Sequence, residues 1–92
     1  MIFVITYHQK VTSDDIPKLN GSWKKRIKET LEQKLSTSPA LYGKPLRGDF
    51  SSCFKLRIGD YRVIYQIQKK EVFVFYIQHR SVVYTHRIGD RL

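Results

Sequence analysis

The spacing of hydrophobic and polar residues changes several times along the chain, and each spacing predicts an element. A β-branched and aromatic run over 2–7 predicts a first strand. After Ser22, which can cap a helix, apolar residues recur every four positions and predict an amphipathic helix that ends near Ser36. Further along, runs rich in β-branched, aromatic and other apolar residues predict three strands, over 53–58, 61–68 and 71–78.

The segments between these elements contain residues that interrupt regular structure. Ser13 followed by two aspartates is typical of a helix start, but Pro17 comes soon after it. We therefore expect a short or interrupted helix between residues 10 and 19. The stretch TSPALYGKPLRG over 37–48 contains two prolines and two glycines, and it is predicted to be a loop.

Together these elements predict one small α+β domain over residues 1–92. Two N-terminal helices are expected to pack on a twisted, largely antiparallel sheet in the order β-α-α-β-β-β, with a short C-terminal helix or tail from Arg80. No apolar run approaches the roughly 20 residues that cross a bilayer, and the N-terminal run is expected to be a strand rather than a signal peptide. The single cysteine, Cys53, excludes an internal disulfide and favours a reducing, cytoplasmic environment.

The dipeptide Gly59-Asp60 predicts a two-residue hairpin turn, which sets the register of the strands on either side. In that register Arg57 lies opposite Arg62, and Lys55 lies on the same face. The other face is apolar and consists of Phe54, Leu56, Ile58, Tyr61, Val63 and Tyr65.

A second turn, around residues 69 and 70, connects the last two strands. If the alternation continues through it, Phe73, Phe75 and Ile77 share the face of the basic residues. His79 is then the next residue on the same line, and Arg80 follows it at the end of the strand.

Two arginines that face each other across strands destabilise a sheet. Either an anion binds between Arg57 and Arg62, or both guanidiniums extend into water, and the pair alone favours neither alternative. The predicted position of His79 and Arg80 beside the pair favours an anion site.

The charge of the chain indicates the kind of partner. Seventeen Lys and Arg residues against eight Asp and Glu residues give a formal charge of +9. Such an excess speeds encounter with polyanions, so nucleic acid is the first candidate partner and an acidic protein is the second. An incidental high isoelectric point is the structural alternative.

Three segments, YGKPLRG, FKLRIGDYRVIYQI and VFVFYIQHRSVVY, follow one another between Pro39 and Tyr84. As an ordered set they resemble the RelE/ParE toxin superfamily, and specifically its RelE-like ribonuclease branch. The resemblance implies the toxin of a type II toxin–antitoxin system, which cuts mRNA in the ribosomal A site without a metal or another cofactor. The scarcity of acids and the lack of a metal-ligand spacing agree with this implication.

Metal-free cleavage lets the RNA 2′-hydroxyl attack the adjacent phosphate. This reaction needs a base, cations for the developing charge and an acid for the leaving oxygen. The resemblance places Lys55 and Arg57 near the scissile phosphate, although relatives often carry lysine where Arg57 stands. Because arginine is a poor proton acceptor, the base is expected to be Lys55 or His79.

The resemblance gives roles to three further residues. Arg62 stabilises the transition state, Arg80 assists the leaving group, and Tyr84 stacks on or orients the substrate base. The structural alternatives are a solvated strand lysine for Lys55, a hydrogen-bonding strand end for His79 and a core-edge tyrosine for Tyr84. Additional contacts with RNA or the ribosome are expected from basic residues that could equally form a solvated surface: Lys24, Lys25, Lys28, Lys44 and Arg47.

Two alternatives to the nuclease stay open. The ParE-like branch has the same fold but inhibits DNA gyrase without a nuclease site, and a decayed RNA-binding relative would explain the arginine at position 57. The toxin interpretation implies an adjacently encoded antitoxin, the ribosome and mRNA as partners, and no membrane. We expect a monomer for the toxin alone and a hetero-oligomer with the antitoxin.

Overall fold

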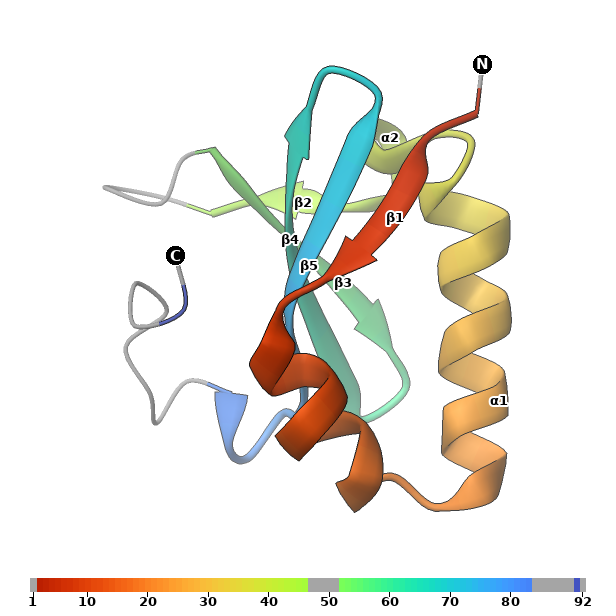
Figure 1. The fold of residues 1–92 in the computed structure, drawn as a ribbon, viewed down its shortest axis with the longest axis vertical. Coiled ribbons are helices and arrows are strands. Elements are labelled where there is room, and N and C mark those ends of the chain that lie inside the picture. Colours follow the sequence, from red (N-terminus) through yellow and green to blue (C-terminus); the bar gives the residue numbers. More distant parts are fainter. Residues whose placement is uncertain (1, 47–51, 84–90, 92) are drawn as a thin grey trace.

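The chain folds into a five-stranded mixed sheet with a long helix across one face (Figure 1). The structure is a computed structural model that describes residues 2–46, 52–83 and 91. The strand order is β1-β5-β4-β3-β2, in which β1 runs parallel to β5 and every other pair is antiparallel. The strands are β1 (Val4–Tyr7), β2 (Lys44–Pro45), β3 (Cys53–Ile58), β4 (Tyr61–Gln68) and β5 (Glu71–His79). The predicted α+β class is confirmed.

Two helical regions follow β1, as the sequence predicts. The first is short and irregular, with a π-helical turn η1 (Val11–Asp15) followed by a 3₁₀ turn η2 (Ile16–Lys18). The second consists of α1 (Gly21–Thr30) and its continuation η3 (Leu31–Leu35). Within the described residues, no helix is long and apolar enough to cross a membrane.

The start of α1 differs by two residues from the prediction. The N-cap is Asn20, whose side-chain oxygen accepts the Trp23 backbone N–H at 2.9 Å. Ser22 lies inside the helix and donates its hydroxyl to the same oxygen. Both residue types cap helices well, and the cap in the structure is Asn20, which immediately precedes Gly21, the first residue of the helix.

Two short elements occupy part of the predicted loop, so the loop assignment over 37–48 is wrong there. Helix α2 (Pro39–Tyr42) begins with a proline in its first turn. A backbone N–H at this position would have no hydrogen-bond partner within the helix, so proline breaks no helical hydrogen bond there. Strand β2 then pairs with β3 through two residues. The buried Tyr65 hydroxyl donates to the Pro39 carbonyl at 2.6 Å and so joins α2 to the sheet.

The main core lies between the helices and one face of the sheet. Trp23 packs against its edge beside Tyr61, with ring centroids 4.7 Å apart. The predicted apolar stripe of α1 and η3 is confirmed, because its inner residues are almost fully buried. The buried residues of this core are Val11, Leu19, Ile27, Leu31, Leu35, Leu56, Ile58, Val63, Tyr65, Val72, Val74 and Ile77.

A smaller apolar cluster covers part of the opposite face. Val83, the last residue described before the C-terminal stretch, is fully buried in it. This face is therefore divided between an apolar half and a basic half. The apolar half consists of Cys53, Ile64, Phe75, Tyr76 and Val83, with Leu46 and Phe73 at its margin.

A β-bulge in β5 changes which side chains face which side of the sheet. Consecutive residues of β4 pair with Val74 and Tyr76, so Phe75 is an extra residue on β5. Before and at the bulge, Phe73 and Phe75 lie on the predicted face. Beyond it the alternation is inverted, and Ile77 lies in the main core. The prediction that Ile77 shares the face of the basic residues is wrong for this reason.

The buried Tyr65 phenol predicts a loss of stability in alkali. Burial raises the pKa of Tyr65 to about 12, so the fold favours the neutral phenol over its anion. Stability from this group is present below the unfolded pKa of about 10, and it is lost as the pH rises towards 12. Tyr65→Phe should lose about 1–3 kcal/mol at pH 7, because the Pro39 carbonyl loses its donor, and should show a shallower alkaline decline.

Urea unfolding at pH 7, 9 and 11 measures both effects of the Tyr65 substitution. Burial and the Glu32 carboxylate raise the pKa of Tyr7 as well, so the variant retains part of the decline. Equal alkaline slopes for wild type and variant would contradict the assignment to Tyr65.

Candidate functional site: a cationic face beside the β3–β4 turn

Four cations lie on the face of the sheet that is turned away from α1. Lys44 of β2 pairs with Lys55 of β3, and Arg57 of β3 pairs with Arg62 of β4. Directly paired residues share a face, and so do Lys55 and Arg57, which are two positions apart. The predicted hairpin register of β3 and β4 is therefore confirmed. Lys44, which was predicted to lie in a loop, lies on the same face of the sheet. We call these four residues the cationic face.

The side chain of Arg62 folds back over the hairpin turn. Its Nη1 donates to the carbonyl oxygens of Gly59 and Tyr61, at 3.0 and 3.1 Å. Gly59 has a φ of +58°, and a Cβ there would lie 2.5 Å from the Trp23 ring, so the turn is packed closely against α1. Both of these hydrogen bonds use Nη1 of the Arg62 guanidinium.

Arg80 lies beside the same turn. Its backbone N–H donates to the Asp60 carbonyl at 2.8 Å, and its Nε lies 3.9 Å from the Asp60 carboxylate. Both side chains are about 62% exposed, so this ion pair is weak and leaves the arginine accessible. The structure thus brings Arg57, Arg62 and Arg80 around one end of the sheet.

His79 lies on the opposite side of the sheet from the cationic face. It pairs with Tyr61, and the two rings meet edge to face with centroids 5.5 Å apart. Its Nδ1 accepts the Ser81 backbone N–H at 3.1 Å and lies 2.8 Å from the Ser81 hydroxyl. The prediction that His79 continues the line of basic residues is wrong, because the bulge at Phe75 inverts the alternation before it.

The predicted RNA-contacting lysines of α1 lie on the helical side of the molecule. All three lysines are exposed, and Lys24 and Lys28 also border an apolar groove between α1, η1 and η2. The structure therefore separates these lysines from the cationic face by the thickness of the sheet (Figure 1). Two other predicted residues, Arg47 and Tyr84, lie outside the described residues.

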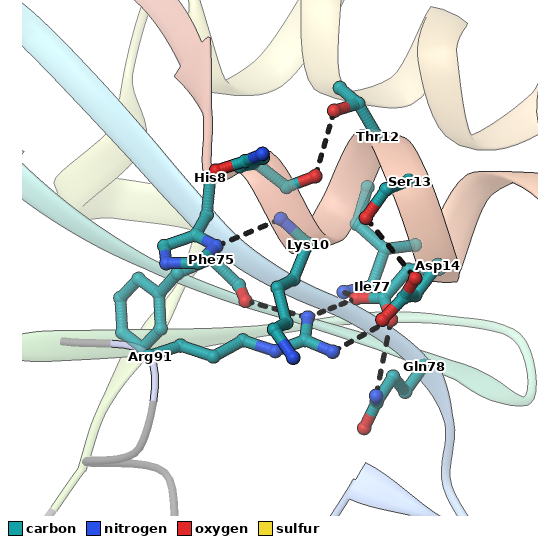
Figure 2. Close-up of polar contacts among 11 residues, drawn as sticks. His8, Lys10, Thr12, Ser13, Asp14, Phe75, Ile77, Gln78 and Arg91 are labelled. Carbon is teal, nitrogen blue, oxygen red and sulfur yellow. Dashed lines mark hydrogen bonds and ion pairs between the residues drawn. The ribbon is translucent and has the colours of Figure 1, made fainter.

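A buried ion pair at the edge of β5 was not predicted from the sequence. Arg91 makes a two-pronged contact with Asp15, at 2.6 and 3.1 Å, and the two side chains are 10% and 1% exposed. The same guanidinium donates to the Phe75 carbonyl at 3.1 Å (Figure 2). It also lies over the Tyr76 ring, 4.3 Å from the ring centroid. The Asp15 carboxylate also accepts the Ile77 backbone N–H at 3.0 Å.

The Asp15–Arg91 pair supplies partners to the backbone groups around the bulge. One member accepts the N–H of Ile77 and the other donates to the carbonyl of Phe75. A bulge removes such groups from the strand ladder, so the pair stabilises the bulge and connects Arg91 with η1. The only sequence signal for this was an aspartate two residues before Pro17 and an arginine in the tail, which by themselves indicate no contact.

Comparison with known proteins places this arrangement in a family. Residues 8–84 match the family described as the ParE toxin of the type II toxin–antitoxin system parDE. The match covers most of the chain. The chain belongs to the RelE/ParE toxin superfamily.

Relatives of this RelE/ParE toxin agree with the assignment. Toxin RelG of Mycobacterium tuberculosis is 36% identical over 52 residues, which are 54% of this chain and 60% of that relative. The alignment therefore spans less than two thirds of the relative's length.

Two solved structures are similar to the toxin over nearly their whole length. The toxin–antitoxin complex RelBE2 from M. tuberculosis has a TM-score of 0.76 at 25% identity, covering 87% of this chain and 100% of that chain. A mutant of E. coli toxin RelE in the free state has a TM-score of 0.75 at 23% identity, covering 100% of both. The latter likeness shows that the fold is shared.

The cationic face of this toxin is suited to a phosphodiester. Arginine binds phosphate oxygens through its planar fork and lysine binds them as a point charge. Of the acids in the described residues, Asp60 is the one in the β3–β4 turn, and it already contacts Arg80. Within the same residues, no group of three or more His, Cys, Asp and Glu side chains is arranged to hold a metal ion.

Proposed function

We propose that this toxin is a ribosome-dependent endoribonuclease that cuts mRNA in the ribosomal A site without a metal ion. The observation that carries the proposal is the direct pairing of Arg57 with Arg62 beside Lys55. A sheet tolerates two facing arginines best when an anion lies between them, and the scissile phosphate is such an anion.

In this mechanism the 2′-hydroxyl attacks the adjacent phosphate and leaves a 2′,3′-cyclic phosphate. Arg57 clamps the phosphate, and Arg62 stabilises the charge that develops on it. Lys55 is the proposed base, because it extends from the same face. Arg80 assists the departing oxygen from its exposed position at the turn, and Tyr84 orients a substrate base. A domain of 92 residues offers little surface to align RNA, so the ribosome supplies much of the alignment.

We also propose that an adjacently encoded antitoxin binds this toxin in the cytoplasm and forms a hetero-oligomer with it. Support comes from similar structures that are toxin–antitoxin complexes, among them the RelB–RelE complex from Methanococcus jannaschii, with a TM-score of 0.70. A charge of +9 favours an antitoxin segment with acidic residues.

One observation keeps a second function in view. The matching family is described by its ParE toxin. The resemblance to the ParE-like branch implies inhibition of DNA gyrase. A gyrase inhibitor has no need of paired arginines and a lysine on one face, so we favour the nuclease.

Primer extension on mRNA from translating ribosomes tests the nuclease. New 5′ ends inside codons at the A site, formed only when the toxin is added, are the expected result. If no new ends form while supercoiling by DNA gyrase is inhibited, the second function replaces the first.

Substitutions at Lys55 and His79 identify the base. Lys55→Ala should slow cleavage about 10²–10⁴-fold, the range typical of a general base. Lys55→Arg keeps the charge but accepts no proton, so it should be nearly as slow, whereas a purely electrostatic lysine would be largely replaced by arginine. His79→Ala should retain more activity than either, because the imidazole lies across the sheet. Single-turnover cleavage rates measure the three variants.

A further inference from the structure

Three arginines from different parts of the fold meet at the β3–β4 turn. Arg62 of β4 donates to the Gly59 carbonyl at 3.0 Å. Arg80, which follows β5, donates its backbone N–H to the Asp60 carbonyl at 2.8 Å. Arg26 of α1 reaches the same turn, because its Nη1 lies 3.7 Å from the position that a Cβ on Gly59 would take. This third arginine has no role in the proposed cleavage mechanism.

The ring of Trp23 holds Arg26 at the turn. The Arg26 Cζ lies over the indole, 4.9 Å from the ring centroid. The indole itself packs against the Tyr61 ring and closely against Gly59. A guanidinium on a tryptophan face is attracted by the ring, and its N–H donors still point outward in the guanidinium plane. The side chain is therefore positioned before a ligand binds.

The place of Arg26 on α1 distinguishes it from the lysines of the same helix. Lys24 and Lys28 border the groove on the side of η1 and η2. Arg26 instead contacts the hairpin, at the residue whose carbonyl accepts a hydrogen bond from Arg62. The contacts thus point to Arg26, rather than to the predicted lysines, as the cation of α1 that lies beside the cationic face.

The charges at the turn are unbalanced. Asp60 is the one acid of the turn, and its weak ion pair is with Arg80. Arg26 is exposed and makes no ion pair with any residue that the structure describes. Like charges that lie close together raise the free energy of the free toxin, and an anion bound beside them lowers it. A strand of RNA presents such anions as a regular series of phosphates.

We propose that Arg26 binds a phosphate of the RNA substrate that flanks the scissile phosphate, and so positions the strand over the β3–β4 turn. Arg57 and Arg62 hold the scissile phosphate on the cationic face, and Arg26 continues the line of cations around the end of the sheet. Arg26 is a positioning residue, because it contacts a part of the RNA that does not react. The choice of RNA as the ligand rests on the proposed function.

Titration with a short single-stranded RNA tests the contact separately from cleavage. The RNA carries 2′-O-methyl groups, which remove the attacking hydroxyl. With ¹⁵N-labelled toxin, the Arg26 Nε–H and the Trp23 indole N–H should shift in a saturable way. Arg26→Ala should weaken binding about tenfold, as expected for loss of one charge-assisted contact. The slope of the logarithm of the binding constant against the logarithm of the salt concentration should become shallower by about 0.7.

Two further variants separate the contact from net charge. Arg26→Lys keeps the charge but loses the planar fork, so it should recover only part of the binding. Lys34→Ala is the matched control, because Lys34 lies on η3, the continuation of the same helix, and its Nζ also lies over an aromatic ring, that of Tyr42. This control should bind RNA nearly as wild type does. Circular dichroism melts of all variants exclude unfolding as the cause of any loss.

Cleavage kinetics then distinguish a positioning residue from a catalytic one. In single-turnover assays on ribosomes, the loss in Arg26→Ala should lie mainly in the toxin concentration that gives half of the maximal rate, which should rise about tenfold. The loss in Arg62→Ala should lie mainly in the maximal rate itself. A loss of maximal rate in Arg26→Ala as large as that in Arg62→Ala would overturn the positioning role.

Several binding results would also overturn the inference. Inorganic phosphate that reproduces the shifts at the same concentrations would indicate a general anion site. No saturable shift, or equal losses in Arg26→Ala and Lys34→Ala, would indicate an effect of net charge alone. Weaker ribosome binding by Arg26→Ala, with unchanged binding of the short RNA, would assign the contact to ribosomal RNA instead. If the wild type cuts no RNA but binds the short RNA through Arg26, the proposed function fails and the binding site stands.

Discussion

Replacing Arg62 with alanine should lower the rate of mRNA cleavage by a factor of about 10²–10³ or more, which removes detectable cutting. The size of the effect follows from losing a preorganised cation at the point where charge develops on the phosphate. The variant also leaves Arg57 without an opposing guanidinium, so the anion site is halved. Primer extension on translating ribosomes, with wild type and variant side by side, measures the loss.

The fold should survive this substitution. Arg62 contributes two hydrogen bonds to turn carbonyls, at an exposed and a half-buried position, and losing them should lower the melting temperature by only a few degrees. Arg62→Lys separates charge from shape, because lysine keeps the charge and loses the fork. Lys70→Ala removes the same unit of charge at the far turn and serves as the control. Equal loss in Lys70→Ala and Arg62→Ala would contradict a specific role for Arg62.

Breaking the Asp15–Arg91 pair should cause the largest loss of stability. Removing one partner of a buried ion pair typically costs about 3–5 kcal/mol, because the other charge stays buried without compensation. Arg91→Met and Asp15→Asn should each lower the melting temperature by about 15 °C or more for a domain of this size. The Asp15 variant also weakens acceptance of the Ile77 N–H at the bulge.

A double-mutant cycle separates the pair from its surroundings. Asp15→Asn combined with Arg91→Met should cost less than the sum of the single losses, since neither charge is then left alone. Asp14→Asn changes the neighbouring, exposed aspartate and should shift the melting temperature by little. Additive single losses, or an equal loss in Asp14→Asn, would contradict a buried coupled pair.

The hairpin was predictable because its signals are local. Gly59 and Asp60 form a two-residue turn between alternating runs. Once this turn is identified, the register and the face of every residue in β3 and β4 are fixed. The stripe on α1 was predictable for the same reason, since each apolar residue is one turn from the next. The facing arginines of the cationic face follow directly from this register.

The position of His79 depended on a feature that leaves no local pattern. The run from Val72 to Ile77 is apolar at every position, so an extra residue in it interrupts no alternation. The bulge is stabilised instead by Asp15 and Arg91, which are 76 residues apart in the sequence. Contacts between residues so far apart in the sequence depend on tertiary packing, and a single sequence contains no pattern that reveals them.

The parallel pairing of β1 with β5 affects how the chain folds while it is being synthesised. Val4 pairs with Glu71 and Tyr7 with Val74. Strand β1, which is synthesised before β5, can therefore join the sheet only after β5 is present. Joining segments so distant in sequence requires closing a long loop, which slows folding. A partly synthesised chain without β5 therefore lacks the closed sheet that positions the cationic face.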